Sequence, residues 1–240
     1  RQKSEPTGSP PKPNPPAAGQ ATVSTPSSAV LDEIVQPFNQ GVGLMEQYRP
    51  GEAVQAFEAV ARRAPEWIAG RLNLAIALLN SQSDEGYVRA EKELKWVIDK
   101  DPNNPHAHYA LGMLFVHLAR FDEAKARFDA VLKIDADDAD AHYQLGSLLV
   151  EDDPPAARRH MEKTLEKIPH HESACYRLAT LLRNAGQPQL AQEYLARFQA
   201  LKSSGVGVFS GMKYGEMGRY AEVIRAFEAP RSNAPNRGVP

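Results

Sequence analysis

The seven histidines are the first residues whose type suggests chemistry, because imidazole binds metal ions and transfers protons near neutral pH. His106, His108 and His117 lie within one short stretch, and His170 and His171 are adjacent. On a helix, His106 and His117 are separated by three turns, roughly 16 Å, which is too far to share one ion. Adjacent side chains such as His170 and His171 diverge. The histidines therefore predict no metal site.

The acidic stretch DADDADAH at 135–142 is the other candidate for metal binding. It lacks the central glycine that a calcium loop needs for its turn, and the twelfth position is Gly146 instead of a bidentate glutamate. We therefore expect a solvated turn between helices here. No metal ion and no other cofactor is predicted.

Catalytic motifs are missing from the sequence as well. It has no GxxxxGK[ST] phosphate loop, no HExxH zinc motif and no GxSxG nucleophile motif. Cys175 is the single cysteine, so a multi-cysteine zinc site or an intramolecular disulfide is impossible, and we expect its thiol to be buried and unreactive. The sequence thus favours a protein that is not an enzyme.

Composition and charge limit the kinds of molecule that this chain is expected to bind. The 28 Lys and Arg residues against 30 Asp and Glu give a net charge of -2, which offers no attraction for nucleic acid. The longest apolar run, near 111–119, is interrupted by Gly112 and His117 and is too short to span a bilayer. A protein or peptide partner is the expectation that remains.

The ends of the chain differ from its middle. Residues 1–29 are rich in Pro, Ser, Thr and Gly and predict a disordered linker, or alternatively a proline-rich ligand for an SH3-like or WW-like domain. Residues 231–240 also predict a linker. Between them, residues 30–230 show helical periodicity and no alternating strand pattern.

The middle of the chain is an internal repeat with a spacing close to 34 residues, as in HYALG at 108–112 and HYQLG at 142–146. Small residues recur at the eighth position of each unit and, except in the last, at the twentieth, and bulky apolar residues recur at the twenty-fourth. Such a pattern predicts two antiparallel helices that approach closely at one point. We place six units at 34–67, 68–104, 105–138, 139–171, 172–203 and 204–230.

This pattern resembles the tetratricopeptide repeat family, in which each unit is a helix-turn-helix. His108, His142 and Cys175 stand where the family prefers tryptophan, and burial between helices accounts for them. The resemblance implies an all-α, right-handed superhelical solenoid of about six such repeats. It also implies that the first helix of each unit lines a concave groove, where a peptide or protein partner binds.

The groove positions of the family identify candidate binding residues in this chain. They are Phe38, Asn39, Asn73, His106, Tyr109, Met113, His117, Tyr143, Gln144, Tyr176, Arg177 and Arg183. Tyr109, Tyr143 and Tyr176 follow one another at intervals of one repeat, either as a ladder for a peptide or as rings that cover the helix seam.

The polar groove positions carry two further alternatives. Asn39 and Asn73 resemble the asparagine ladder by which some members of the family hold a peptide main chain, or they are solvated surface. Arg177 and Arg183 either bind a carboxylate or phosphate group or pair with acids such as Glu151. The Lys and Asn pair of the chaperone-binding carboxylate clamp is missing from every unit.

Together these features predict a non-catalytic scaffold that binds a partner in the concave groove. The alternative is a substrate-recruiting or assembly module of a larger enzyme or β-propeller protein. The proline-rich start and the RGVP end resemble exported bacterial proteins of that kind, although a cytoplasmic protein is equally compatible with the sequence. Because Tyr220 and Val223 would lie on an uncapped last helix, we also expect docking of this end to a further domain or to a second copy.

Overall fold

The computed structural model describes residues 25–225, which form ten α-helices and one short 3₁₀ helix. Nothing is described for 1–24 or 226–240, so the C-terminal linker predicted at 231–240 and nearly all of the N-terminal one lie outside these residues. The elements are α1 (Ser28–Glu46), α2 (Pro50–Arg63), α3 (Ile68–Asn80), α4 (Asp84–Lys100), α5 (Pro105–His117), α6 (Phe121–Ile134), α7 (Ala139–Leu148), α8 (Pro154–Lys167), α9 (Glu172–Asn184), α10 (Pro188–Ser204) and η1 (Arg219–Ala221).

Local sequence signals set where most helices begin. A side chain just before the helix accepts a hydrogen bond from a backbone N–H of the first turn at six starts, those capped by Ser27, Ser83, Asn104, Asp138, Asp153 and His171. Proline occupies the first turn of α2, α5, α8 and α10, where its missing N–H costs no hydrogen bond. The helices are thus specified locally before they pack.

The turn within a helical pair repeats as well. Backbone in the left-handed region reverses the chain after α1, α3, α5 and α9, at Tyr48, Gln82, Ala119 and Gly186. Each of these residues lies two positions beyond the end of its helix. Four of the five helical pairs therefore share one turn geometry in spite of their different sequences, and the pair of α7 and α8 does not.

Glycine at the eighth position of a unit lets the two helices of a pair meet. A Cβ atom on Gly41 would lie 2.6 Å from the ring of Phe57, and one on Gly112 would lie 2.9 Å from the ring of Phe128. Any larger side chain would have to displace an aromatic ring that is fully buried. The contact joins the eighth and twenty-fourth positions, as the repeat pattern predicts.

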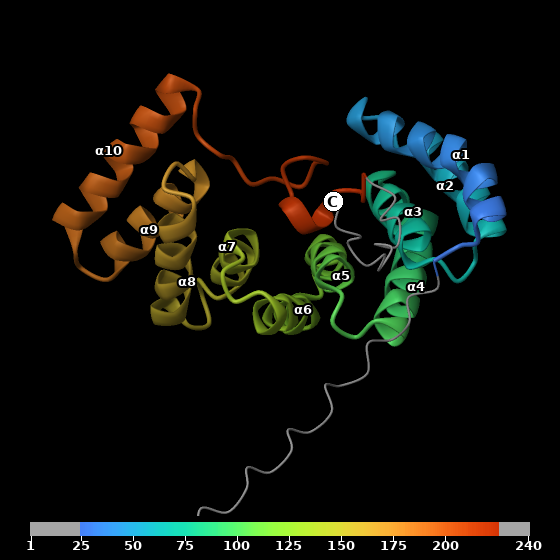
Figure 1. Cartoon of the computed structure of the whole chain (residues 1–240). Helices are drawn as coiled ribbons and strands as arrows, with labels where there is room; N and C mark the ends of the chain where they lie inside the picture. The colour runs from blue at the N-terminus through green and yellow to red at the C-terminus, as the bar shows by residue number, and fades with distance from the viewer. Residues whose placement is uncertain (1–24, 226–240) are drawn as a thin grey trace, which may run out of the picture.

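The helical pairs stack side by side into an arc, with α3, α5, α7 and α9 toward its inner side and α4, α6 and α8 toward its outer side (Figure 1). The apolar interior forms two clusters, one from α1 to the start of α7 and one from α7 to α10. Among residues 25–225, no helix is both long and apolar enough to cross a lipid bilayer. The all-α solenoid expected from the repeats is confirmed.

The prediction of a sixth helical pair over 204–230 is wrong. As far as Arg225, the only helical element after α10 is η1, and the chain instead turns back across the inner side of the arc (Figure 1). The reason lies in its glycines, since each costs a helix about 1 kcal/mol relative to alanine. Val223, expected on an uncapped helix face, is 4% exposed within the first core cluster, so that argument for self-association fails.

Candidate functional site

Residues 206–225, here called the C-terminal segment, run along the inner side of the solenoid from α9, past α7 and α5 together, to α3 (Figure 1). Their direction is opposite to the order of the helical pairs. Tyr214, Met217, Ala221 and Val223 are buried and complete the first core cluster. The inner side is therefore covered in part by the chain itself.

The segment is attached first at the start of α9. The backbone of Val208 exchanges two hydrogen bonds there: it accepts from the N–H of Glu172 at 2.9 Å and donates to the carbonyl oxygen of His170 at 2.9 Å. The side chain of Ser210 lies 3.0 Å from His171 Nε2. This short parallel pairing anchors the segment to the second core cluster before it reaches the first.

Tyr109 of α5 holds the middle of the segment. Its ring has no exposed surface and its hydroxyl donates a hydrogen bond to the carbonyl oxygen of Met217 at 2.5 Å. The next residue is Gly218, where a Cβ atom would lie 2.6 Å from that hydroxyl oxygen and 2.7 Å from Cβ of Asp140. The backbone passes so close to α5 and α7 that only glycine fits.

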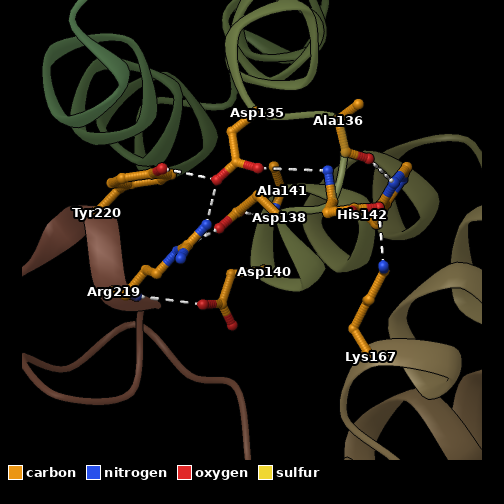
Figure 2. Close-up of polar contacts among 10 residues, drawn as sticks. Asp135, Ala136, Asp138, Asp140, Ala141, His142, Lys167, Arg219 and Tyr220 are labelled. Atoms are coloured by element: carbon orange, nitrogen blue, oxygen red, sulfur yellow. Dashed lines mark hydrogen bonds and ion pairs between the residues drawn. The ribbon is translucent and has the colours of Figure 1, made fainter.

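Arg219 and Tyr220 reach from the segment to three carboxyl groups at the start of α7 (Figure 2). Arg219 Nε donates to Asp138 at 2.8 Å, its Nη2 pairs with Asp135, and its backbone N–H donates to Asp140 at 3.1 Å. The Tyr220 hydroxyl donates to Asp135 at 2.7 Å. We call Asp135, Asp138 and Asp140 the acidic cluster.

Asn73 of α3 holds the end of the segment through its side-chain amide. The amide nitrogen donates to the carbonyl oxygen of Ile224 at 2.9 Å, and the amide oxygen accepts from the N–H of Ile224 at 2.7 Å. Asn73 has no exposed surface, so both bonds are shielded from water. An amide that donates and accepts in this way recognises a main chain whatever its side chain.

Burial by the segment changes the acidity of the groups beneath it. It raises the pKa of the Tyr109 hydroxyl and, with the hydrogen bond to Asp135, the pKa of Tyr220 to about 12. Burial also lowers the pKa of His106, whose ring lies edge-on to Tyr220 at 4.9 Å between centroids. Burial raises the pKa of the Asp140 carboxyl, and the neighbouring Asp138 raises it further. In all four groups the pKa shift is toward the neutral form.

The predicted groove residues fall into three groups. Asn73, His106 and Tyr109 contact the C-terminal segment, and Gln144 lies beside the Tyr109 hydroxyl. Phe38 and Met113 were predicted to line the groove, but both have no exposed surface and belong to the core. Phe38 packs on Phe57 and Trp67. The other predicted residues are Asn39, His117, Tyr143, Tyr176, Arg177 and Arg183.

Of these, Tyr143 is 6% exposed and its hydroxyl accepts a hydrogen bond from Arg177 Nε at 3.1 Å. Tyr176 is 52% exposed, with its ring 5.3 Å from that of Phe198. Arg177 and Arg183 are exposed along α9, Asn39 is exposed on α1, and His117 is exposed at the end of α5 beside Tyr87. The three tyrosines are therefore spaced about one repeat apart in the sequence, but among them only Tyr176 has a side chain exposed enough to contact a partner.

The acidic cluster and its ligand are the functional residues that sequence reasoning missed. The stretch 135–142 was expected to be a solvated turn, whereas Asp138 is 1% exposed and both caps α7 and binds Arg219. Its three carboxyl groups indicated a site that could bind a cation, but nothing in the spacing of the repeats pointed to an arginine about 80 residues away. The glycines around Arg219 were the only hint that this region is not helical.

The histidines and the cysteine have structural roles. His108 is 6% exposed and its Nε2 lies 2.9 Å from the carbonyl oxygen of Pro102. His142 Nδ1 lies 2.9 Å from His160 Nδ1, so one of the two rings is the donor. Cys175 is fully buried, which raises the pKa of its thiol. Within 25–225, no three His, Cys, Asp or Glu side chains gather as a metal site would require.

His171 makes the stability depend on pH. It is fully buried, its Nδ1 accepts from the N–H of Ala174 at 3.1 Å, and burial lowers its pKa from 6.5 to about 4. As pH falls from 6.5 to 4, His171 is protonated in the unfolded chain but stays neutral in the folded chain. This difference is expected to lower the free energy of unfolding by about 3 kcal/mol. Urea unfolding at pH 7, 5.5 and 4.5 measures this loss.

The variant His171→Asn keeps the capping acceptor and removes the titration, so its stability is expected to fall less over the same pH range. His117→Asn, at an exposed position, is the matched control and keeps the slope of the wild type. Parallel curves for the wild type and His171→Asn would contradict the assignment.

Comparison with known proteins agrees with this architecture. The family model described as tetratricopeptide repeat matches residues 84–149, which span α4 to the end of α7. This part of the chain matches the tetratricopeptide repeat family. Among solved structures it is similar to MamA from Desulfovibrio magneticus RS-1, with 21% identity, a TM-score of 0.63, and coverage of 72% of this chain and 97% of that one.

A second similar structure is that of pilF from Pseudomonas aeruginosa, with 16% identity, a TM-score of 0.65, and coverage of 72% of this chain and 78% of that one. At such identities the likeness concerns the fold. A curated relative, the human protein O-mannosyl-transferase TMTC3, is 24% identical over 163 residues, which are 67% of this chain. This chain spans 17% of the length of that relative.

Proposed function

We propose that this chain is a non-catalytic scaffold that binds an extended segment of a protein partner along the inner side of the solenoid. Tetratricopeptide repeats generally act in protein interactions, and the neighbours of this chain share their fold. The observation that carries the proposal is the pair of hydrogen bonds between the Asn73 amide and the Ile224 main chain. A site that holds one extended backbone in this way has the geometry to hold another.

The part of the inner side along α9 is open to a partner. Tyr176 is 52% exposed, and Phe209 of the C-terminal segment is 56% exposed. Arg177 and Arg183 are exposed on the same helix and supply hydrogen-bond donors. Aromatic rings beside arginines are the residue types that contribute most to protein interfaces. We place the first contacts of the partner here.

Photo-crosslinking in cells that express the full chain tests this proposal. A benzophenone side chain placed at Tyr176 is expected to form covalent adducts with a partner polypeptide. The matched control position is Val88 on α4, which is 72% exposed but lies on a second helix of a pair, toward the outer side. Equal adducts at both positions, or none at Tyr176, would contradict the proposal.

A second role is favoured by the likeness to TMTC3, whose name is that of a transferase. In that role the solenoid recruits substrate proteins for a catalytic domain on the same polypeptide. The inner side would bind in the same manner in both cases. The full gene sequence separates the two roles, because only the second requires a catalytic domain.

A further inference from the structure

We propose that the inner side of α5 and α7 is a recognition site for an extended protein segment in which a small residue precedes an arginine and an aromatic residue, and that residues 217–224 occupy this site as a built-in, displaceable ligand. The inference deepens the proposed function and rests on it, because it names the chemistry of the partner.

Charge is the first argument for displacement. The guanidinium of Arg219 contacts two carboxyl groups of the acidic cluster, those of Asp135 and Asp138. The third, that of Asp140, accepts only the backbone N–H of Arg219. Lys167, on α8, pairs with Asp137 at 2.8 Å instead of with the cluster (Figure 2). The site therefore accepts more positive charge than its present occupant supplies.

The present occupant also carries a charge of the wrong sign. Glu222 follows Arg219 by three residues, and the backbone N–H of Arg219 bonds Asp140 at 3.1 Å, so the negative charge of Glu222 is held near the acidic cluster. After burial and Asp138, Glu222 also helps to raise the pKa of the Asp140 carboxyl, whereas Arg219 lowers it. Within the segment, Glu222 pairs with Arg225 at 3.0 Å, and both side chains are exposed. A partner segment with a neutral or basic residue at this position would avoid the repulsion. The built-in ligand is thus an imperfect match to its own site.

Sterics define the rest of the recognition pattern. The position of Gly218 admits no side chain, because Tyr109 and Asp140 would touch a Cβ atom. Tyr220 lies against His106 and Tyr109, and its hydroxyl reaches Asp135. Ala221 and Val223 are 1% and 4% exposed, which requires small or apolar residues. The pattern is therefore glycine, arginine, aromatic, small residue, any residue, and valine or a similar apolar residue.

The connection to α10 makes this occupancy a competition. A short tether raises the effective concentration of a built-in ligand to the millimolar range, so a partner must bind better or the tethered ligand must be weakened. The stretch that leads from α10 contains Gly205, Gly207 and Gly211, and Val206 is 65% exposed. An exposed connection rich in glycine allows residues 217–224 to leave the site without unfolding α10.

Fluorescence anisotropy of labelled peptides on the full chain tests the inference. The probes span residues 212–225 in three forms: the native sequence, the sequence with Glu222→Lys, and the sequence with Arg219→Ala. The receptors are the wild type, the full-chain variant Arg219→Ala, whose own ligand is weakened, and Arg219→Ala combined with Asp135→Asn. Circular dichroism shows that each receptor remains helical.

The native peptide is expected to bind the Arg219→Ala chain at least about tenfold more tightly than the wild type, since a hydrogen-bonded charge pair contributes that much or more. The Glu222→Lys peptide binds more tightly still, and the Arg219→Ala peptide binds at least about tenfold more weakly. Adding Asp135→Asn to the receptor weakens the native peptide but changes the binding of the Arg219→Ala peptide little.

A second format covers a receptor variant that fails to fold. A protease site inserted between Gly205 and Val206 of the wild type is cut after folding, and labelled peptides are exchanged against the cut segment. The Glu222→Lys peptide is expected to replace that segment more completely than the Arg219→Ala peptide. Equal binding of the arginine and alanine peptides in either format would overturn the inference.

Two outcomes separate this inference from the proposed function. If the peptides do not distinguish arginine from alanine while crosslinks at Tyr176 persist, the scaffold role stands and the partner chemistry is wrong. If light scattering shows that the Arg219→Ala chain forms a stable dimer with exchanged segments, the site belongs to a second copy, and a separate partner is excluded.

Discussion

Replacing Phe128 with alanine is expected to lower the free energy of unfolding by about 3–5 kcal/mol, the cost of removing a large buried ring. The Phe128 ring has no exposed surface, lies edge-on to Tyr109 at 5.3 Å between centroids, and fills the space beside Gly112. Its removal therefore leaves a cavity at the centre of the third helical pair, directly beneath the ring that holds the C-terminal segment. Chemical denaturation followed by circular dichroism measures the loss.

Leu195→Ala is the matched control, because Leu195 occupies the same position in the fifth helical pair. That side chain is 37% exposed, so its removal takes less apolar surface out of contact and leaves no enclosed cavity. We expect a loss well below that of Phe128→Ala. Similar losses for both variants would show that the repeat position, and not burial, sets the energy, contrary to our account.

Replacing Gly218 with alanine is expected to release the C-terminal segment from the solenoid. Gly218 has φ 107° and ψ 160°, a region open essentially to glycine alone, where another residue costs about 1–3 kcal/mol of strain. The new Cβ atom would also collide with Tyr109 and Asp140. We expect faster tryptic cleavage after Arg219 and a lower melting temperature, while the helix content measured by circular dichroism is kept.

Gly215→Ala separates backbone strain from the collision. Gly215 also has a positive φ, 84°, but the nearest atom to its Cβ position is the Tyr48 hydroxyl oxygen at 3.7 Å, which is ordinary contact. Strain without collision should leave the segment bound for more of the time. If Gly215→Ala and Gly218→Ala are cleaved equally fast, the close approach of Gly218 to α5 is not what keeps the segment in place.

The helical pairs could be predicted from the sequence because their packing is local. Gly41 and Phe57, or Gly112 and Phe128, lie 16 residues apart, within one unit, so the repeat pattern records their contact directly. Helix starts are just as local, since residues such as Asn104 and Asp138 cap the helix that follows them. A small and a bulky residue recur at this spacing in the first, third and fifth units, which leaves a signal that one sequence can show.

The inner side could not be predicted because its contacts are unique and distant. Asn73 meets Ile224 at a separation of 151 residues, and Asp138 meets Arg219 at a separation of 81. No repeat records such pairs. The small and bulky residues at Gly211 and Phe227 even continued the repeat pattern, although the intervening glycines oppose a helix. The sequence left two alternatives for Asn73, a hold on a peptide main chain or solvated surface, and its contact with Ile224 of the same chain required the structure.

The most direct test of the account is the side-chain amide of Asn73 in an NMR spectrum of the full chain. Its two protons and the N–H of Ile224 are expected to exchange slowly with solvent and to show nuclear Overhauser effects to each other, because Asn73 is buried and bonds Ile224 in both directions. Rapid exchange of both groups, with random-coil shifts for residues 214–225, would show that the inner side is empty and contradict the account.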